Sequence, residues 1–266
     1  MQLMHVKRWI TALLSLPVII YLIGYSPPYG FYILTGVVQF ISLRELYRIT
    51  KVSLFFQVLA YLLSFFLLLL ILEKLFFLFP FAVFCCICLP FILSIIKGLI
   101  PSRSLIEDIA KCIFGIVYIT VPFLMLVLIY CYPGGKAWIF FLLCVIFTTD
   151  TFAFYFGRYL GRHKLNEKLS PKKTWEGAIS GFVFSVICGL LFIRAFRLMK
   201  VNAEAFILVS VLSIMGQIGD LAESMIKRSY NVKDSGSILP GHGGMLDRID
   251  SFLFSIPILY GYILTR

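Results

Sequence analysis

Residues 52–72 read VSLFFQVLAYLLSFFLLLLIL, an uncharged and almost wholly apolar run that is long enough to cross a bilayer as one helix. Similar runs recur along the chain. Of its 266 residues, 61% are hydrophobic and only 14% are charged, whereas soluble domains are about 25% charged. This composition excludes an ordinary soluble globular protein. We therefore expect an all-α, polytopic integral membrane protein.

The apolar runs predict nine membrane-spanning helices. The first lacks a small-residue cleavage site before Ser26, so we interpret it as an uncleaved span. No soluble segment separates the spans, so residues 1–266 are predicted to form one membrane domain, with amino-terminal spans in 1–135 and a catalytic portion in 136–266. The nine predicted spans are 9–25, 29–46, 52–72, 75–96, 109–132, 137–156, 177–196, 205–222 and 250–264.

Basic residues fall mainly on one side of this predicted topology. The net charge is +11, from 24 Lys and Arg against 13 Asp and Glu. Eighteen of the 24 lie at the amino terminus or after spans two, four, six and eight, and six lie on the other side. Since basic connections stay in the cytoplasm, the larger group is predicted to be cytoplasmic. Two long polar connections, 157–176 and 223–249, lie on that side, and we expect the function there.

Two carboxylates stand inside apolar spans. Asp150 lies in the run TTDT and Asp220 in the run GQIGD. A carboxylate inside a bilayer costs about 2.5 to 3.5 kcal/mol on insertion scales, so such residues usually mark function. The alternative is that each aspartate only hydrogen-bonds to a neighbouring helix and stabilises packing.

Further acids follow at helical spacing. A helix from Asp220 would carry Glu223, Ser224 and Lys227 on one face. Asp247 and Asp250 repeat the offset of three residues, so four carboxylates would gather at one cytoplasmic mouth. Oxygen ligands without a Cys or His set favour Mg²⁺ or Mn²⁺ over zinc. The alternative is a solvated helix end with salt-bridged acids.

Two segments offer phosphate binding. Residues 241–244 read GHGG, and glycines let successive backbone N–H groups turn toward an anion. A tight turn without a ligand is the alternative. Residues 170–177 read SPKKTWEG, in which Ser170 before Pro171 predicts a helix start; a plain basic flank is the alternative here. The cations that would neutralise phosphate charge are Lys172, Lys173, Lys227, Arg228, Lys233 and Arg248.

The run from 224 to 250 resembles the signature of phosphatidate cytidylyltransferases, also called CDP-diacylglycerol synthases. It contains SMIKR at 224–228, KDSG at 233–236 and LPGHGGMLDRID at 239–250. Upstream pieces resemble the same family and extend the likeness to residues 149–250. They are TDT at 149–151 with Gly157 and Arg158, SPKKT at 170–174 with Glu176 and Gly177, and Gly219-Asp220 with Glu223-Ser224.

The resemblance implies an Mg²⁺-dependent enzyme, with Mn²⁺ as a substitute, that transfers CMP from CTP to phosphatidic acid and releases pyrophosphate. It implies metal binding by Asp220 and Asp247, with Asp250, Glu223 and Asp150 as additional ligands. Catalytic roles fall to Asp220, Asp247, Lys227, Arg228 and Arg248. Substrate binding falls to Lys172, Lys173, Arg158, Lys233, His242, Gly243, Gly244 and Ser224.

We expect CTP, phosphatidic acid and the lipid bilayer as partners, no nucleic acid, and leave a homodimer open. The compact chain predicts a bacterial inner-membrane protein whose active site faces the cytoplasm.

The alternative function is a cation- or proton-coupled transporter, because intramembrane acids are also expected there. Such a protein should place its acids near the bilayer midplane within inverted repeats, and neither feature is plain in this sequence.

Overall fold

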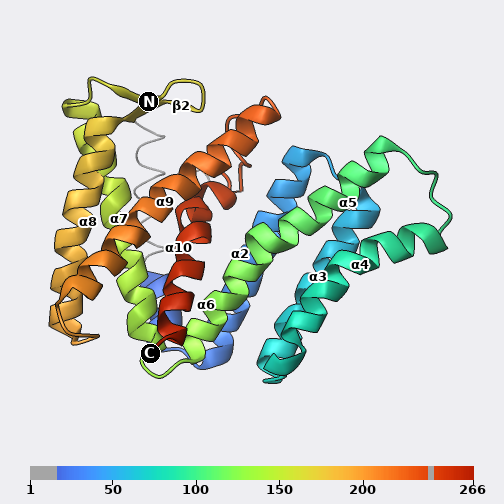
Figure 1. Cartoon of the computed structure of the whole chain (residues 1–266), viewed down its shortest axis with the longest axis horizontal. Helices are drawn as coiled ribbons and strands as arrows, with labels where there is room; N and C mark the ends of the chain where they lie inside the picture. Colours follow the sequence, from blue (N-terminus) through green and yellow to red (C-terminus); the bar gives the residue numbers. More distant parts are fainter. Residues whose placement is uncertain (1–16, 239–242) are drawn as a thin grey trace. The chain divides into compact units, whose positions relative to one another are not determined.

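The computed structural model describes residues 17–238 and 243–266. Each predicted span within them coincides with helical structure (Figure 1). Of the first predicted span, residues 17–24 are described and are helical. The elements in chain order are α2 (Pro28–Thr50), α3 (Leu54–Leu72), η1 (Phe76–Leu78), α4 (Phe79–Ile96), α5 (Arg103–Gly115), η2 (Ile116–Thr120), α6 (Val121–Cys131), α7 (Gly135–Tyr159), β1 (Lys164–Asn166), β2 (Ser170–Thr174), α8 (Trp175–Phe196), α9 (Ala203–Ser229) and α10 (Leu246–Leu264).

The helices confirm an all-α protein with membrane character. Five described helical stretches are long and apolar enough to cross a bilayer: α3, the continuous run Arg103–Cys131, α7, α8 and α9. The predicted count of nine spans is not confirmed. The apolar part of α4 is shorter than these five, and α2 and α10 are helices that do not belong to them.

The described chain forms two compact units. Unit 1 comprises Met1–Leu124 and Ser235–Leu246, and unit 2 comprises Met125–Asp234 and Asp247–Arg266. The short segment Ser235–Leu246 therefore belongs with the amino-terminal helices, although it follows α9 in the sequence. Leu246, which begins α10, is the last residue of that segment.

Buried polar contacts join the helices of unit 1. The Tyr47 hydroxyl of α2 donates to the Cys112 carbonyl of α5 over 2.9 Å. Thr120, in the π-helical turn η2, lies 2.8 Å from the Ser64 hydroxyl of α3 and accepts from Gln39 of α2 over 3.4 Å. Satisfying these groups within the protein lets the helices pack without leaving polar atoms exposed to lipid.

Small residues and hydroxyls hold α7, α8 and α9 together in unit 2. A Cβ atom at Gly181 of α8 would lie 2.7 Å from the Thr149 carbonyl oxygen of α7, so only glycine permits this approach. The Ser213 hydroxyl of α9 lies 3.0 Å from that of Thr149 and 2.8 Å from that of Ser185 on α8. This is the close packing with hydroxyl cross-links that is typical of membrane helices.

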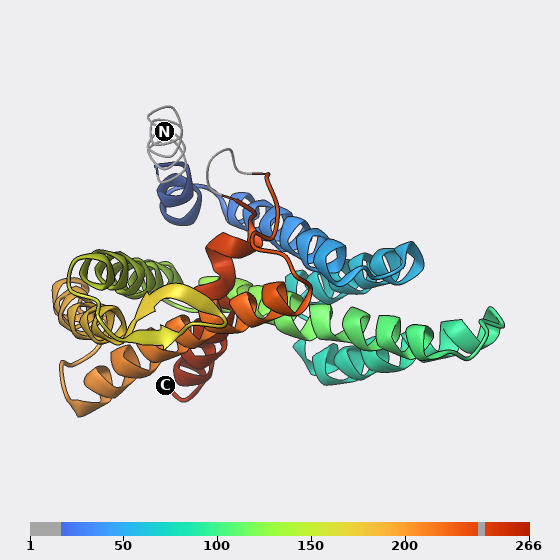
Figure 2. The same cartoon turned by 90° about the horizontal axis from the view of Figure 1, so that it is seen from above.

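A β-hairpin connects α7 to α8, and the sequence did not predict it (Figure 2). Strands β1 and β2 pair antiparallel with Lys164 opposite Thr174. The predicted helix start at Ser170 is wrong: α8 begins at Trp175, because the Thr174 side chain caps it by accepting from the Gly177 N–H over 3.2 Å. Pro171 is compatible with a strand at a sheet edge, where no ladder donor is needed.

The second predicted connection, 223–249, is shorter than expected. Helix α9 continues to Ser229 and α10 already begins at Leu246. Acidic and basic residues at offsets of three and four can pair along one helix, so the polar composition after Asp220 does not end α9. As a result, Glu223, Lys227 and Asp247 lie on helices, which give them fixed positions.

Candidate active site

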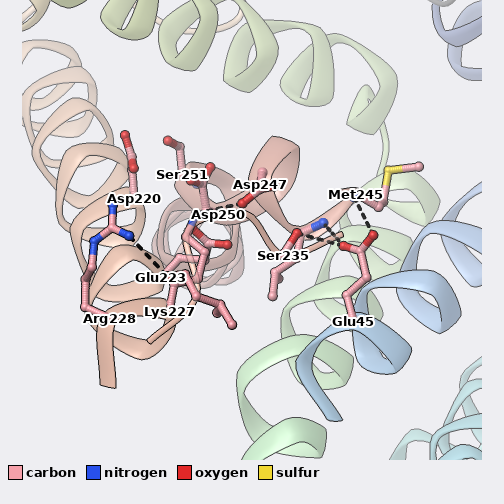
Figure 3. Close-up of polar contacts among 12 residues, drawn as sticks. Glu45, Asp220, Glu223, Lys227, Arg228, Ser235, Met245, Asp247, Asp250 and Ser251 are labelled. Carbon is pink, nitrogen blue, oxygen red and sulfur yellow. Dashed lines mark hydrogen bonds and ion pairs between the residues drawn. The ribbon is translucent and has the colours of Figure 1, made fainter. Parts of the chain in front are cut away.

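The predicted acidic residues gather in unit 2, and Figure 3 shows the four that lie on α9 and α10. Each carboxylate of the cluster is within electrostatic range of at least one other. We call this group the carboxylate cluster: Asp150 on α7, Asp220 and Glu223 on α9, and Asp247 and Asp250 on α10.

Lys227 forms a buried bridge between α9 and α10. Its ammonium lies 2.6 Å from Oδ1 of Asp247 and also contacts Oε2 of Glu223, one helical turn earlier on α9. Lys227 is 9% exposed and Glu223 is fully buried. Removing one partner from such an arrangement leaves an uncompensated buried charge, which typically costs about 3 to 5 kcal/mol. The bridge therefore fixes the start of α10 against α9.

A second ion pair joins the hairpin to the cluster. Lys173 of β2 places its ammonium 2.6 Å from Oδ2 of Asp220, and both side chains are half-buried. Asp150 on α7 is within electrostatic range of Asp220, Lys173 and Arg248. The unpredicted hairpin is thus the element that brings Lys173 to the acids.

Helices α9 and α10 approach closely beside Asp250. A Cβ atom at Gly219 would lie 2.5 Å from the Asp250 carbonyl oxygen, so a glycine is required there. The buried Asp250 carboxylate accepts from the Ser251 N–H over 2.7 Å and is within electrostatic range of Asp220 and Glu223. Gly219, which precedes Asp220, therefore permits the gathering of acids.

The cluster suits a divalent cation in its donor chemistry. Within residues 17–238 and 243–266, no three His, Cys, Asp or Glu side chains already form a metal site. Lysine ammonium groups lie between the carboxylates instead. In the same part of the chain, Oε2 of the buried Glu223 contacts the Lys227 ammonium, and Oε1 accepts no hydrogen bond. All-oxygen donors of this kind fit Mg²⁺ or Mn²⁺.

The other predicted site residues are mostly exposed. Arg228 donates from Nε to the Leu169 carbonyl over 3.3 Å and from Nη1 to the Val232 carbonyl over 3.1 Å, so it connects α9 to the hairpin. Ser224 is buried on α9. His242 lies outside the described residues, and Gly243 and Gly244 belong to unit 1. The exposed cations are Lys172, Arg158, Lys233, Arg228 and Arg248.

Comparison with known proteins settles the family. The profile of the cytidylyltransferase family matches residues 6–265. The chain belongs to this family. A phosphatidate cytidylyltransferase of Staphylococcus haemolyticus is 43% identical over 179 residues, which cover 65% of this chain and 66% of that protein. Those of Bacillus subtilis and Staphylococcus aureus (strain COL) are 46% and 39% identical, over 47% and 66% of their lengths.

The matched segments span about two thirds of the staphylococcal relatives and about half of the Bacillus relative. The resemblance to phosphatidate cytidylyltransferases predicted from the motifs is confirmed. The carboxylate cluster and the exposed cations therefore belong to a member of the cytidylyltransferase family.

Sequence reasoning missed one buried acid of this cytidylyltransferase family member. Glu45 of α2 is 3% exposed and lies in unit 1. Its setting, FISLRELYRIT, reads as the basic flank of a span. The signal that would have found it is the rule already applied to Asp150 and Asp220, that a carboxylate at the end of an apolar helix needs a partner.

Proposed function

We propose that this chain transfers the cytidylyl group of CTP to phosphatidic acid, giving CDP-diacylglycerol and pyrophosphate. The observation that carries the proposal is the carboxylate cluster with its two bound lysines. It is built on α7, β2, α9 and α10. Relatives named phosphatidate cytidylyltransferase and the family match support the same chemistry.

The reaction needs little covalent chemistry from the protein. A phosphate oxygen of phosphatidic acid attacks the α-phosphorus of CTP, a new P–O bond forms, and the bond to the oxygen bridging toward the β-phosphate breaks. Pyrophosphate leaves with that bonding pair. Because the lipid phosphate is already a nucleophile, no Ser-His relay is required. The protein must instead hold both substrates in line and offset their negative charge.

Asp220 and Asp247 are the proposed metal-holding residues, with Asp250, Glu223 and Asp150 beside them. When bound, Mg²⁺ supplies positive charge that stabilises the triphosphate and the developing pyrophosphate. Lys173 holds the Asp220 carboxylate, and Lys227 holds those of Glu223 and Asp247. These lysines orient the acids and keep their mutual repulsion low.

The exposed cations are the proposed phosphate-binding groups. Lys172 follows Pro171 on the same hairpin strand as Lys173, and Arg248 lies between the two acids of α10. Arg158, Lys233 and Arg228 complete this set, with Ser224, His242, Gly243 and Gly244 assigned to the nucleotide. Lys227 already contacts two carboxylates, so it would reach a phosphate only by exchanging one of them.

The charge asymmetry of the sequence supports an inner-membrane protein with its site on the cytoplasmic side. Single cysteines placed at Lys172 and at Lys233 in a cysteine-free background should label from the same, cytoplasmic side. Labelling from opposite sides would show that the two connections cannot serve one site.

The decisive assay uses purified protein with CTP, phosphatidic acid and Mg²⁺, and follows pyrophosphate and liponucleotide. We expect both products in equal amounts, loss of both with EDTA, recovery with Mg²⁺ or Mn²⁺, and poor recovery with zinc. In proteoliposomes, ionophores that collapse proton and Na⁺ gradients should leave the rate unchanged. Solute uptake without CTP consumption would favour the transporter instead.

A further inference from the structure

The Glu45 carboxylate contacts both ends of the unit 1 segment Ser235–Leu246 (Figure 3). It accepts from the Ser235 hydroxyl over 2.9 Å at one end. At the other end it accepts from the Met245 N–H over 3.0 Å and the Leu246 N–H over 2.8 Å. One side chain of α2 thus anchors two points that are ten residues apart along the chain.

Two glycines provide room for this carboxylate because they have no side chain. A Cβ atom at Gly236 would collide with Oε1 of Glu45, and one at Gly244 would collide with Oε2 and with the Ser235 hydroxyl. The neighbouring Gly243 has φ +84°, a left-handed conformation that favours glycine. The backbone at Gly236 and at Gly244 therefore lies closely against the Glu45 side chain.

The Glu45 carboxylate is held by hydrogen bonds from neutral groups. In the part of the chain that the structure describes, no lysine or arginine forms an ion pair with it, and the three donors are neutral. A buried carboxylate is stabilised by such a set of hydrogen bonds. Leu246 is the first residue of α10, whose initial N–H groups have no partner within the helix, so Glu45 also caps α10.

We propose that Glu45 is a positioning residue for the carboxylate cluster. Leu246, which Glu45 holds, is joined directly to Asp247, whose carboxylate accepts from Lys227 over 2.6 Å. Anchoring the backbone at Met245 and Leu246 orders the residue that is peptide-bonded to Asp247, and so restricts the conformations in which the chain can enter α10. Glu45 touches no substrate in this role. The proposal rests on the proposed function for its catalytic consequence, and on unit 1 alone for the anchor.

Glu45→Gln is the first test, because glutamine keeps the shape but replaces one acceptor oxygen with an NH₂ group. Outer groups that orient metal ligands typically change activity by about 10- to 100-fold when lost. We expect kcat for liponucleotide formation to fall within that range and the Mg²⁺ concentration for half-maximal rate to rise. Glu45→Asp keeps the charge on a shorter side chain and should fall between Glu45→Gln and the parent.

Ser42→Ala is the matched control. Ser42 is a fully buried polar residue one turn earlier on α2, and its hydroxyl donates only to the Val38 carbonyl of the same helix, over 2.7 Å. Its loss should leave kcat and the Mg²⁺ requirement within about twofold of the parent, since this hydrogen bond lies within α2 and its loss leaves no group of another element unpaired.

Hydrogen exchange gives a readout that does not depend on activity. In Glu45→Gln, at least one of the Met245 and Leu246 amides should exchange about tenfold faster than in the parent, because one of the two acceptor oxygens is replaced by an NH₂ group. Ser235→Ala removes one donor to Glu45. The double variant with Glu45→Gln should show no faster amide exchange than Glu45→Gln alone, because both changes break the same network. If Glu45→Gln does not fold, the exchange rates in Ser235→Ala test the anchor instead.

Unchanged exchange at Met245 and Leu246 in Glu45→Gln would overturn the anchor. Faster exchange with an unchanged kcat and Mg²⁺ requirement would overturn the positioning role. If the parent protein forms no liponucleotide, the proposed function fails by itself, and the exchange measurement still decides whether Glu45 holds this segment.

Discussion

Glu45 in unit 1 and Glu223 in unit 2 are both buried helical glutamates, at 3% and 0% exposure, but their partners differ. Glu45 accepts three hydrogen bonds from neutral groups. Glu223 is paired through Oε2 with the Lys227 ammonium, and its Oε1 accepts no hydrogen bond in the described part of the chain. The first carboxylate is satisfied by the fold. The second is paired with a single lysine and lies among other acids, so one of its oxygens is left to accept a cation.

The difference distinguishes a carboxylate that fixes the backbone from one that lies among the proposed metal ligands. In unit 1 a carboxylate fixes the backbone, and exchanging its partners would release a segment of chain. In unit 2 the carboxylates are oriented by lysines, and adding a divalent cation would relieve their repulsion. The two units should therefore respond differently to the same type of substitution.

The largest effect is expected for the acids of unit 2. Asp220→Asn and Asp247→Asn should each abolish turnover while the protein stays folded, because asparagine keeps the shape but loses the charge that a metal requires. Liponucleotide formation measures the loss, and thermal unfolding in detergent checks the fold. The matched control is Glu107→Gln, which changes an exposed acid of α5 that pairs with Arg103. Near-normal activity in both aspartate variants would remove the metal assignment.

A smaller effect is expected at Lys173, which orients Asp220 from the hairpin. Lys173→Gln should lower kcat about tenfold, since a charge-assisted contact of this kind contributes roughly 1.5 to 3 kcal/mol and the metal would replace part of it. Lys168→Gln, which alters an exposed lysine between the two strands, is the comparison. Equal effects of the two variants would mean that the hairpin contributes only general positive charge.

The smallest effect is expected from packing alone. Gly181→Ala should destabilise unit 2 by about 1 to 3 kcal/mol, because the new methyl group would overlap the Thr149 carbonyl. Ser213→Ala should cost about 1 kcal/mol, since it removes two hydrogen bonds between membrane helices that usually contribute about 0.6 kcal/mol each. A Cβ atom at Gly261 of α10 meets nothing within 4 Å among residues 17–238 and 243–266, so Gly261→Ala should be neutral in the same thermal unfolding measurement. A larger loss from Gly261→Ala than from Gly181→Ala would contradict this packing description.

The sequence predicted the helices well because long apolar runs such as 52–72 leave few alternatives in a bilayer. It placed their ends poorly, since caps such as Thr174 depend on local hydrogen bonds. The hairpin was missed because SPKKT lacks the alternating apolar pattern of a strand. It exists through pairing with residues 164–166.

The acids of the site were predictable from helical spacing and from their cost in a membrane, but their partners were not. Lys173 meets Asp220 only through the hairpin, and Glu45 meets Ser235 across 190 positions of sequence. Spacing within one helix says nothing about such distant contacts. A single sequence shows which charges need a partner, and the fold decides which partner each receives.

Direct binding of Mn²⁺ tests the central claim that the carboxylate cluster of unit 2 holds a catalytic divalent cation. Electron paramagnetic resonance would count the Mn²⁺ bound to the purified parent, to Asp247→Asn and to Glu45→Gln in the presence of CTP. We expect Mn²⁺ to bind the parent, to be lost in Asp247→Asn, and to bind Glu45→Gln about 10- to 100-fold more weakly. Equal Mn²⁺ binding by the parent and Asp247→Asn would contradict the account.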